Sequence, residues 1–301
     1  MLPDARSPGP RRSGRTSRPA LTIPGMVLFF KLLARLPLWL LHGAGWVLGW
    51  VVFLASARYR QRLMANTALA GYDFASVRAA VGHAGRMSAE LPRLWLGAPV
   101  ACEWDNDACL DRAYGAARGV VFLTPHLGCF EICAQGLAQR YGARHGPLTV
   151  LYRPARQAWL SRLMAQARHR PGLKTAPTNL AGVRQMMRAL RSGQAVGLLP
   201  DQVPPEGMGL WAPFFGRSAY TMTLSARLAQ QTGATVLLLW GERLPSGRGF
   251  RLHFRELEQP LSADLGTAVL QVNQAMERLI RECPTQYLWG YARYKQPRRE
   301  A

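Results

Sequence analysis

Short apolar runs alternate along most of this chain with segments that carry apolar residues at helical spacing. Runs typical of buried strands occur at 102–104, 120–123, 147–152, 195–199, 235–240 and 251–254. Helical spacing marks the segments 107–117, 130–141, 159–168, 181–191, 223–232 and 267–282. Because strands and helices follow one another in turn, the pattern predicts an α/β fold with a mainly parallel central sheet flanked by helices.

The N-terminal part of the chain has a different pattern. Leu36 to Ala57 runs 22 residues without Lys, Arg, Asp or Glu, which is long enough to cross a hydrocarbon core of roughly 30 Å. Trp39, Trp46 and Trp50 suit the depth of a membrane interface. A buried core helix is the alternative, but such helices seldom stay uncharged on all faces. The pattern predicts a membrane-anchoring helix region over 26–58, followed by an amphipathic helix over 73–97.

Basic residues flank the apolar stretch on both sides and leave its orientation open. Lys31 and Arg35 come before it, and Arg58, Arg60 and Arg62 follow it. With the five arginines of the N-terminal tail added, charge counting mildly favours the tail inside and the main domain outside. A helix that lies in one leaflet would escape that conflict.

Composition bounds the kind of protein. The 301 residues are 49% hydrophobic, which excludes a disordered protein and allows one large domain, expected over 59–297. Residues 1–25 read as a disordered basic tail. Thirty-eight Lys and Arg against 17 Asp and Glu give a net charge of +21. This field favours a nucleic acid, an anionic lipid surface, a phosphorylated ligand or an acidic protein partner.

Cysteine usage gives no sign of a disulfide framework or a metal site. The five cysteines are odd in number and form no CxxC pair, so a reduced compartment fits better. Cys129 and Cys133 read as small buried apolar residues. There is no convincing cluster of metal ligands and no glycine-rich phosphate loop of a standard type. We therefore expect neither metal nor cofactor.

The best candidate for chemistry follows the apolar run that ends at Leu123. Pro125 cannot donate to a sheet ladder, so His126 falls in the first turn beyond a strand, where α/β folds place their chemistry. Glu131 lies five residues later, at the start of a helix, where its carboxylate can orient and polarise the ring. This makes His126 a candidate general base for a hydroxyl nucleophile. A chance spacing of the two residues is the alternative.

Further groups of polar or unusual residues follow this pair in a fixed order. They are Tyr152-Arg153-Pro154, Asp201-Gln202, Pro213-Phe214-Phe215-Gly216 and Pro284-Thr285-Gln286-Tyr287-Leu288-Trp289. With His126 and Glu131 they resemble the bacterial lipid A late acyltransferase family, which includes lauroyl and myristoyl transferases. That family belongs to the lysophospholipid and glycerolipid acyltransferase superfamily with its His-x4-Asp/Glu motif. The resemblance covers roughly residues 26–297. Cys129-Phe130, Val203 and Ala292-Arg293 depart from common family residues and leave the acceptor and acyl chain open.

The resemblance implies a membrane-associated O-acyltransferase. It would move a fatty acyl chain from an acyl carrier protein thioester to a hydroxyl of a lipid A precursor, at the bacterial inner membrane, with the catalytic domain on the cytoplasmic side. His126 would be the general base, Glu131 would stabilise the imidazolium, and the hydroxyl would attack the thioester directly. Acyl-CoA as donor, and a lysophospholipid, ornithine lipid or other glycolipid as acceptor, are alternatives. A ping-pong route through Cys129 is less favoured, because that residue is typical of packing.

Four other residues are candidates for substrate binding. Arg153 would stabilise the oxyanion or bind a phosphate. Asp201 would position substrate or cap a turn, and Arg184 would bind an anionic group or be solvated on its helix. Arg293 would bind phosphate. Phe214, Phe215, Tyr287 and Trp289 read as packing residues.

The basic charge fits three partners: an acidic acyl carrier protein, an anionic glycolipid acceptor and the membrane itself. A membrane-tethered nucleic-acid binder is a competing class, suggested by the net charge alone. The arginines are spread along the whole chain without a binding motif, so we expect no nucleic-acid partner. An inactive relative that binds lipid as a scaffold is a third hypothesis, which the intact His126 and Glu131 pair disfavours.

Overall fold

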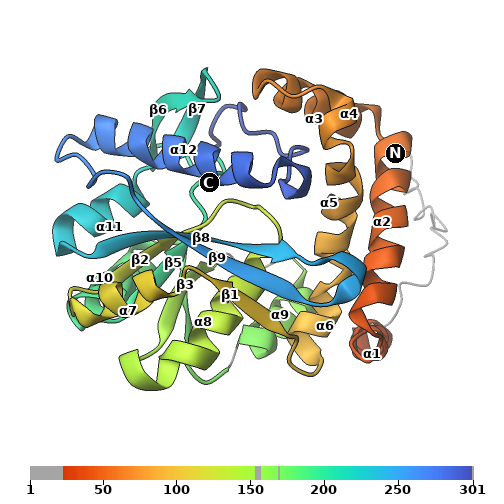
Figure 1. The fold of residues 1–301 in the computed structure, drawn as a ribbon, viewed down its shortest axis with the longest axis horizontal. Coiled ribbons are helices and arrows are strands. Elements are labelled where there is room, and N and C mark those ends of the chain that lie inside the picture. Colours follow the sequence, from red (N-terminus) through yellow and green to blue (C-terminus); the bar gives the residue numbers. More distant parts are fainter. Residues whose placement is uncertain (1–22, 153–156, 169, 300–301) are drawn as a thin grey trace, which may run out of the picture.

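The computed structural model describes residues 23–152, 157–168 and 170–299. A seven-stranded sheet in the order β1-β9-β8-β2-β5-β3-β4 forms its centre (Figure 1). The strands are β1 (Cys102–Asp105), β2 (Val120–Leu123), β3 (Leu148–Tyr152), β4 (Leu173–Pro177), β5 (Ala195–Leu198), β8 (Thr235–Arg243) and β9 (Phe250–Glu256). Neighbouring strands from β8 to β4 are parallel, whereas β9 is antiparallel to β8 and parallel to β1. The predicted mainly parallel α/β fold is confirmed.

Helices cover both faces of this sheet. They are α7 (Ala108–Gly115), α8 (Phe130–His145), α9 (Ala158–Arg168), α10 (Leu180–Arg191), α11 (Leu224–Thr232) and α12 (Leu265–Glu282). Central strand β2 is buried along its whole length and alternates its side chains between the two layers. Val120 and Phe122 pack with α7, α8 and α9. Val121 and Leu123 pack with α10, α11 and α12.

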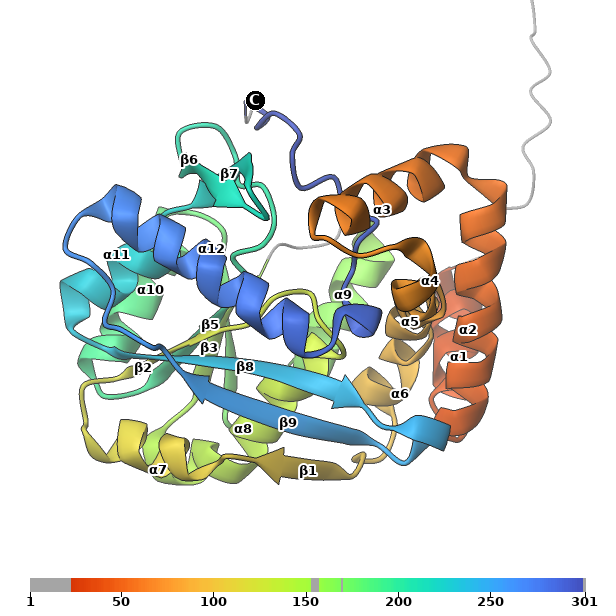
Figure 2. The ribbon, with the colours of Figure 1, turned by 45° about the horizontal axis from the view of Figure 1, so that its top comes forward.

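A separate two-stranded sheet stands beside the main one. Strands β6 (Gly209–Phe214) and β7 (Arg217–Met222) pair antiparallel as a hairpin. Figure 2 shows this hairpin projecting beyond α12. Phe215 and Gly216 form the turn with φ values of 47° and 74°, as a two-residue hairpin turn requires. The hydrophobic pattern predicted no strand between 199 and 235, so both strands of this hairpin were missed. Strand β4 was missed as well.

The N-terminal part folds as a series of helices. They are α1 (Ile23–Leu33), α2 (Leu38–Ala55), α3 (Ala57–Leu69), α4 (Phe74–Val77), α5 (Ala79–Ala89) and α6 (Leu91–Leu96). Pro37 separates α1 from α2, so the uncharged stretch gives an 18-residue helix. The single amphipathic helix expected over 73–97 is divided into α4, α5 and α6, with Pro92 in the first turn of α6. In the described part of the chain, α2 alone is long and apolar enough to cross a bilayer. The tail expected over 1–25 lies almost entirely outside the described residues.

Candidate active site

The register of two parallel strands brings the site together. Leu123 of β2 pairs with Leu198 of β5, so the two strands end at the same edge of the sheet. His126 and Asp201 each lie three residues beyond this pair. Since chain direction and register are shared, the two loops run outward side by side and their side chains meet. This is the edge at which open α/β sheets bind ligands.

Asp201 holds His126 at two points. One carboxylate oxygen lies 2.7 Å from Nδ1 of the ring, and the other accepts the backbone N–H of His126 at 2.9 Å. The hydroxyl of Tyr287 donates to Asp201 at 3.2 Å. Asp201 is only 2% exposed. Burial would raise its pKa, but the adjacent imidazole and the hydrogen bonds from His126 outweigh this and lower the pKa below its usual value. The carboxylate is therefore ionised at neutral pH.

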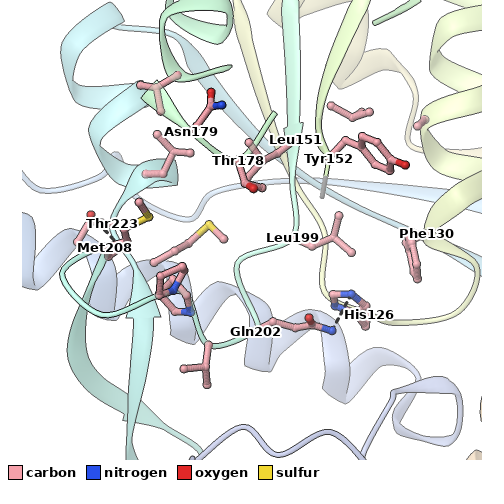
Figure 3. Close-up of a pocket in the computed structure, with 18 of the residues that line it drawn as sticks. His126, Phe130, Leu151, Tyr152, Thr178, Asn179, Leu199, Gln202, Met208 and Thr223 are labelled. Carbon is pink, nitrogen blue, oxygen red and sulfur yellow. Dashed lines mark hydrogen bonds between the residues drawn. The ribbon is translucent and has the colours of Figure 1, made fainter. Parts of the chain in front are cut away.

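The other ring nitrogen of His126 faces Gln202. The side-chain amide nitrogen of Gln202 lies 3.0 Å from Nε2 (Figure 3). Because Asp201 can only accept, the network assigns the proton to Nδ1 and leaves a lone pair on Nε2. Nε2 is the nitrogen that can take a proton from a substrate. Phe130 packs edge-on against the ring at 5.0 Å between centroids.

The loop that carries His126 is fixed by the C-terminal segment. The backbone N–H of Gly128 donates to the carbonyl of Gln286 at 3.0 Å, and that of Leu288 donates to the carbonyl of His126 at 3.1 Å. Gly128 has a φ of 57°, and a Cβ there would collide with the carbonyl of Gly241. A glycine is thus required at this turn. The catalytic candidate sits on a loop with little freedom.

Glu131 lies elsewhere in the same site. Its carboxylate accepts a hydrogen bond from Nε1 of Trp95 at 3.4 Å, and the side chain lines the same cavity as His126. Glu131 was expected to orient the ring of His126, and that role stays a prediction. The structure brings Asp201 into hydrogen-bond contact with the ring. Asp201 was expected to position substrate or cap a turn, so its contact with His126 was not foreseen.

A cavity of about 660 Å³ opens beside His126, within the range of about 300–1,000 Å³ typical of ligand sites. Much of its wall is apolar, with contributions from β3, α8, α9, α10 and β7. Among the lining residues are Phe130, Leu151, Met164, Val183, Leu199 and Met222. Gln202, Asn179 and Thr223 add polar groups to this wall. In Figure 3, His126 and Phe130 lie on the other side of the cavity from Met208 and Thr223. The space suits a long apolar chain next to the imidazole.

The remaining predicted site residues are dispersed. Arg153 lies outside the described residues. Arg184 is exposed on α10, the helix that contributes Val183 to the cavity. Arg293 is 2% exposed, and its guanidinium donates to the carbonyl of Tyr220 at 2.6 Å. This internal contact argues against the predicted binding of a lipid phosphate by Arg293.

Cys129 lies between the histidine loop and α8, at a buried position. Its side chain is 2% exposed, and burial raises the pKa of its thiol well above the usual value. A neutral, shielded thiol is a poor nucleophile. This environment favours direct transfer over a covalent intermediate on Cys129. Tyr287 and Trp289 are buried as expected, but Tyr287 also contacts Asp201 through its hydroxyl.

Fold and site together define a class of protein. A carboxylate-bound histidine with a lone pair on Nε2 suits proton transfer from a hydroxyl, and the adjacent apolar cavity suits a fatty chain. The family model described as bacterial lipid A biosynthesis acyltransferase matches residues 25–296. The chain belongs to this family.

Several curated proteins of related sequence are lipid A acyltransferases by name. A lipid A biosynthesis palmitoleoyltransferase of Escherichia coli K12 is 28% identical over 189 residues, which is 62% of this chain and 59% of the relative. A lipid A biosynthesis acyltransferase of Shigella flexneri matches to the same extent. A lipid A biosynthesis lauroyltransferase of Escherichia coli K12 is 28% identical over 180 residues, covering 59% of this chain and 55% of the relative. The alignments thus span less than two thirds of each relative.

Proposed function

We propose that this protein transfers a fatty acyl chain from an acyl carrier protein thioester to a hydroxyl group of a lipid A precursor. The observation that carries the proposal is the pairing of His126 with Asp201 beside a large apolar cavity, in a chain that belongs to the lipid A acyltransferase family. The named activities of the relatives support the same reaction.

The reaction would proceed by direct attack. The acceptor hydroxyl donates its proton to Nε2 of His126 while its oxygen forms a bond to the thioester carbonyl carbon. The tetrahedral intermediate then expels the thiolate of the donor, which takes the proton back from Nε2. An ester and a free thiol result, and the histidine returns to its starting state. Asp201 remains ionised and stabilises the imidazolium between the two proton transfers.

Two carboxylates compete for the role of charge partner. The sequence motif favours Glu131, and the hydrogen bonds to Nδ1 and to the backbone N–H of His126 favour Asp201. We propose Asp201 as the group that fixes the tautomer and orientation of the ring. Glu131 remains a candidate catalytic residue, because it lines the cavity in which the thioester would lie. Variants of the two residues separate these roles.

The tetrahedral oxyanion needs hydrogen-bond donors. The amide group of Gln202, 3.0 Å from Nε2, occupies the place where the acceptor hydroxyl would bind. Displaced by that hydroxyl, it could donate to the developing oxyanion a short distance away. Arg153 and Arg184 remain candidates for the oxyanion or for an anionic group of the substrate.

Charge and family support the proposed donor and location. Acyl carrier proteins are acidic, and the acceptor would carry phosphates, so a net charge of +21 favours the approach of both. The proposed site of action is the bacterial inner membrane, with the catalytic domain on the cytoplasmic side. Acyl-CoA as the donor is a second possibility, which a donor comparison decides.

An acyl-transfer assay in detergent micelles tests the proposal. Radiolabelled acyl carrier protein thioester is offered with tetra-acylated lipid A precursor or with a lysophospholipid, to the wild type and to His126→Ala. Transfer to the precursor by the wild type alone supports both reaction and base. Transfer only to the lysophospholipid would agree with the proposed mechanism but would contradict the lipid A precursor as the acceptor. Full activity in His126→Ala overturns the mechanism.

A further inference from the structure

Helix α2 has two faces that differ in what they contact. The inner face is buried against the rest of the protein and carries Leu38, Leu41, His42, Gly45, Gly49 and Phe53. The outer face is exposed and apolar, and it continues onto α1. We define this outer face by Leu28, Phe29, Leu32, Trp39, Leu40, Val47, Leu48, Val51, Val52 and Leu54, which are 40–70% exposed. In Figure 2, α1 and α2 form one edge of the molecule, with α5 on their inner side.

The inner face is held by a close helix–helix contact. A Cβ placed on Gly49 would collide with the carbonyl of Val81, and one placed on Gly85 would collide with the backbone of Gly45 and Gly49. The backbones of α2 and α5 therefore touch at two points about one helical turn apart. Packing of this kind depends on small residues on both helices. If α2 moved away as a free-standing span, this contact would be lost.

Charged side chains of the protein also contact the inner face of α2. Nε2 of His42 lies 3.0 Å from one carboxylate oxygen of Glu90, and the other carboxylate oxygen lies 2.7 Å from Nη2 of Arg243. Arg86 donates to the carbonyl of His42 at 3.2 Å and stacks on Trp46 at 4.6 Å. Trp46 lies at the middle of α2 by sequence, so a spanning helix would place Arg86 near the bilayer midplane. Charges at that depth are costly and rare.

The charge pattern identifies what covers the outer face. From residue 23 to residue 72 the sequence has no Asp or Glu, and it has five basic residues. Lys31 and Arg35 precede α2, beside the part of the outer face that α1 carries, and Arg58 follows α2. All three are exposed. The apolar face of α2 thus has basic residues at both ends of the helix and Trp39 on its surface, which matches an anionic lipid interface.

We propose that α1 and α2 lie in the plane of the membrane interface, with the outer face in one leaflet of an anionic bilayer, and that α2 does not span the bilayer. Both ends of α2 then lie on the same side of the membrane as the catalytic domain. The basic residues on both flanks no longer conflict, since the exposed Lys31, Arg35 and Arg58 all meet the headgroups of one leaflet. The inference concerns attachment and is independent of the proposed reaction.

Accessibility to a membrane-impermeant maleimide tests the topology. Arg35→Cys and Arg58→Cys are made separately in the full chain, with the half-exposed Cys102 and Cys283 replaced by serine. If both ends share one side, the two positions are labelled together in sealed inverted inner-membrane vesicles and protected together in intact spheroplasts. Labelling of one position only in spheroplasts and of the other only in inverted vesicles overturns the proposal. Labelling of both positions only in spheroplasts would support the in-plane arrangement, but it would contradict the proposed cytoplasmic location of the catalytic domain.

Depth measurement gives an independent answer if lipid shields the two positions. Nitroxide labels at Trp39, Val47 and Leu54 are compared in vesicles of phosphatidylethanolamine and phosphatidylglycerol, with the exposed residue Arg112 on α7 as an aqueous reference. An in-plane helix gives three similar shallow depths. A depth at Val47 near the bilayer centre, with shallow values at Trp39 and Leu54, contradicts the proposal.

Discussion

Arg243 and Glu90 form a buried ion pair with two hydrogen bonds, at 2.8 Å from Nε and 2.7 Å from Nη2. Nη2 of Arg243 also donates to the carbonyl of Gly128, in the loop that carries His126, at 2.7 Å. Since Glu90 also bonds to His42 of α2, this ion pair connects α2 to the loop that carries His126. An unbroken chain of polar contacts joins the two regions through the interior of the protein.

Removing one partner of this ion pair should be costly. In Arg243→Met the carboxylate of Glu90 would remain buried without its countercharge, and we expect a loss of about 3–5 kcal/mol in the free energy of unfolding. Urea unfolding in detergent, followed by tryptophan fluorescence, measures this loss. Arg251→Met is the matched control, because its ion pair with Glu103 has side chains that are 43% and 52% exposed. An equal loss in the two variants would contradict the prediction.

The same ion pair predicts how stability depends on pH. Burial alone would raise the pKa of Glu90, but the charge of Arg243 and the hydrogen bonds from His42 and Arg243 lower it to about 2 from its usual 4.5. Because the folded pKa lies below the unfolded one, the stabilisation is complete above about pH 4.5 and is lost as the pH falls towards 2. Urea titrations between pH 6 and pH 2 measure this. In Glu90→Gln this part of the pH dependence should vanish. An unchanged pH dependence in that variant would contradict the assignment to Glu90.

Asp201→Asn should reduce kcat strongly. Asparagine carries no charge to stabilise the imidazolium, and its NH2 group cannot accept either of the two contacts that the carboxylate oxygens make with His126. We therefore expect a loss of about 100-fold to 10,000-fold. Initial rates with saturating donor and acceptor measure it. Tyr287→Phe, which removes one hydrogen bond to Asp201, should cause a smaller loss of kcat with little change in KM.

Glu131→Gln is the matched comparison for Asp201→Asn. If Asp201 is the charge partner of His126, the asparagine variant loses more kcat and changes the pH profile of kcat, while the glutamine variant changes mainly KM. The reverse result would assign the role to Glu131, as the sequence motif favours.

The sequence motif favoured Glu131 as the partner of His126, whereas the structure places Asp201 in contact with the ring. This difference has a physical reason. The hydrophobic pattern predicted the strands that end before His126 and Asp201, because β2 and β5 are buried on both faces and their sequences are apolar throughout. Pairing of the two strands depends on tertiary contacts that no local pattern records. Had the parallel register of Leu123 with Leu198 been known, equal offsets of three residues would have indicated the contact. Glu131 was favoured because sequence proximity was the available guide.

Other differences also arise from tertiary context. The hairpin of β6 and β7 was missed because Pro213 and the pair Phe215-Gly216 resemble a loop in composition. Its β7 strand is fixed from outside by Arg293, which donates to Tyr220. That long-range contact also explains why Arg293 is buried, although an arginine near the C-terminus usually suggests an exposed anion-binding group.

Cys129→Ala should retain most of the transfer activity. The thiol is buried and its pKa is raised, so a covalent acyl-cysteine is not expected. Mass spectrometry of the enzyme incubated with donor alone should detect no acyl adduct on Cys129 in the wild type. Double-reciprocal plots of the initial rates, with both substrates varied, should give intersecting lines. Parallel lines together with an inactive Cys129→Ala variant would contradict direct transfer and support a ping-pong mechanism.

Two glycines of α2 offer a paired test of the contact between α2 and α5. A Cβ on Gly49 would collide with the carbonyl of Val81, whereas a Cβ on Gly43 would meet nothing within 4 Å. Both substitutions by alanine raise helix propensity, by up to about 1 kcal/mol each. We therefore expect Gly43→Ala to leave thermal stability unchanged or slightly higher, and Gly49→Ala to lower it by separating the helices. Differential scanning fluorimetry in detergent measures both. Equal behaviour of the two variants would mean that α2 is not held against α5 in solution, and the in-plane arrangement of the anchor would lose its main structural support.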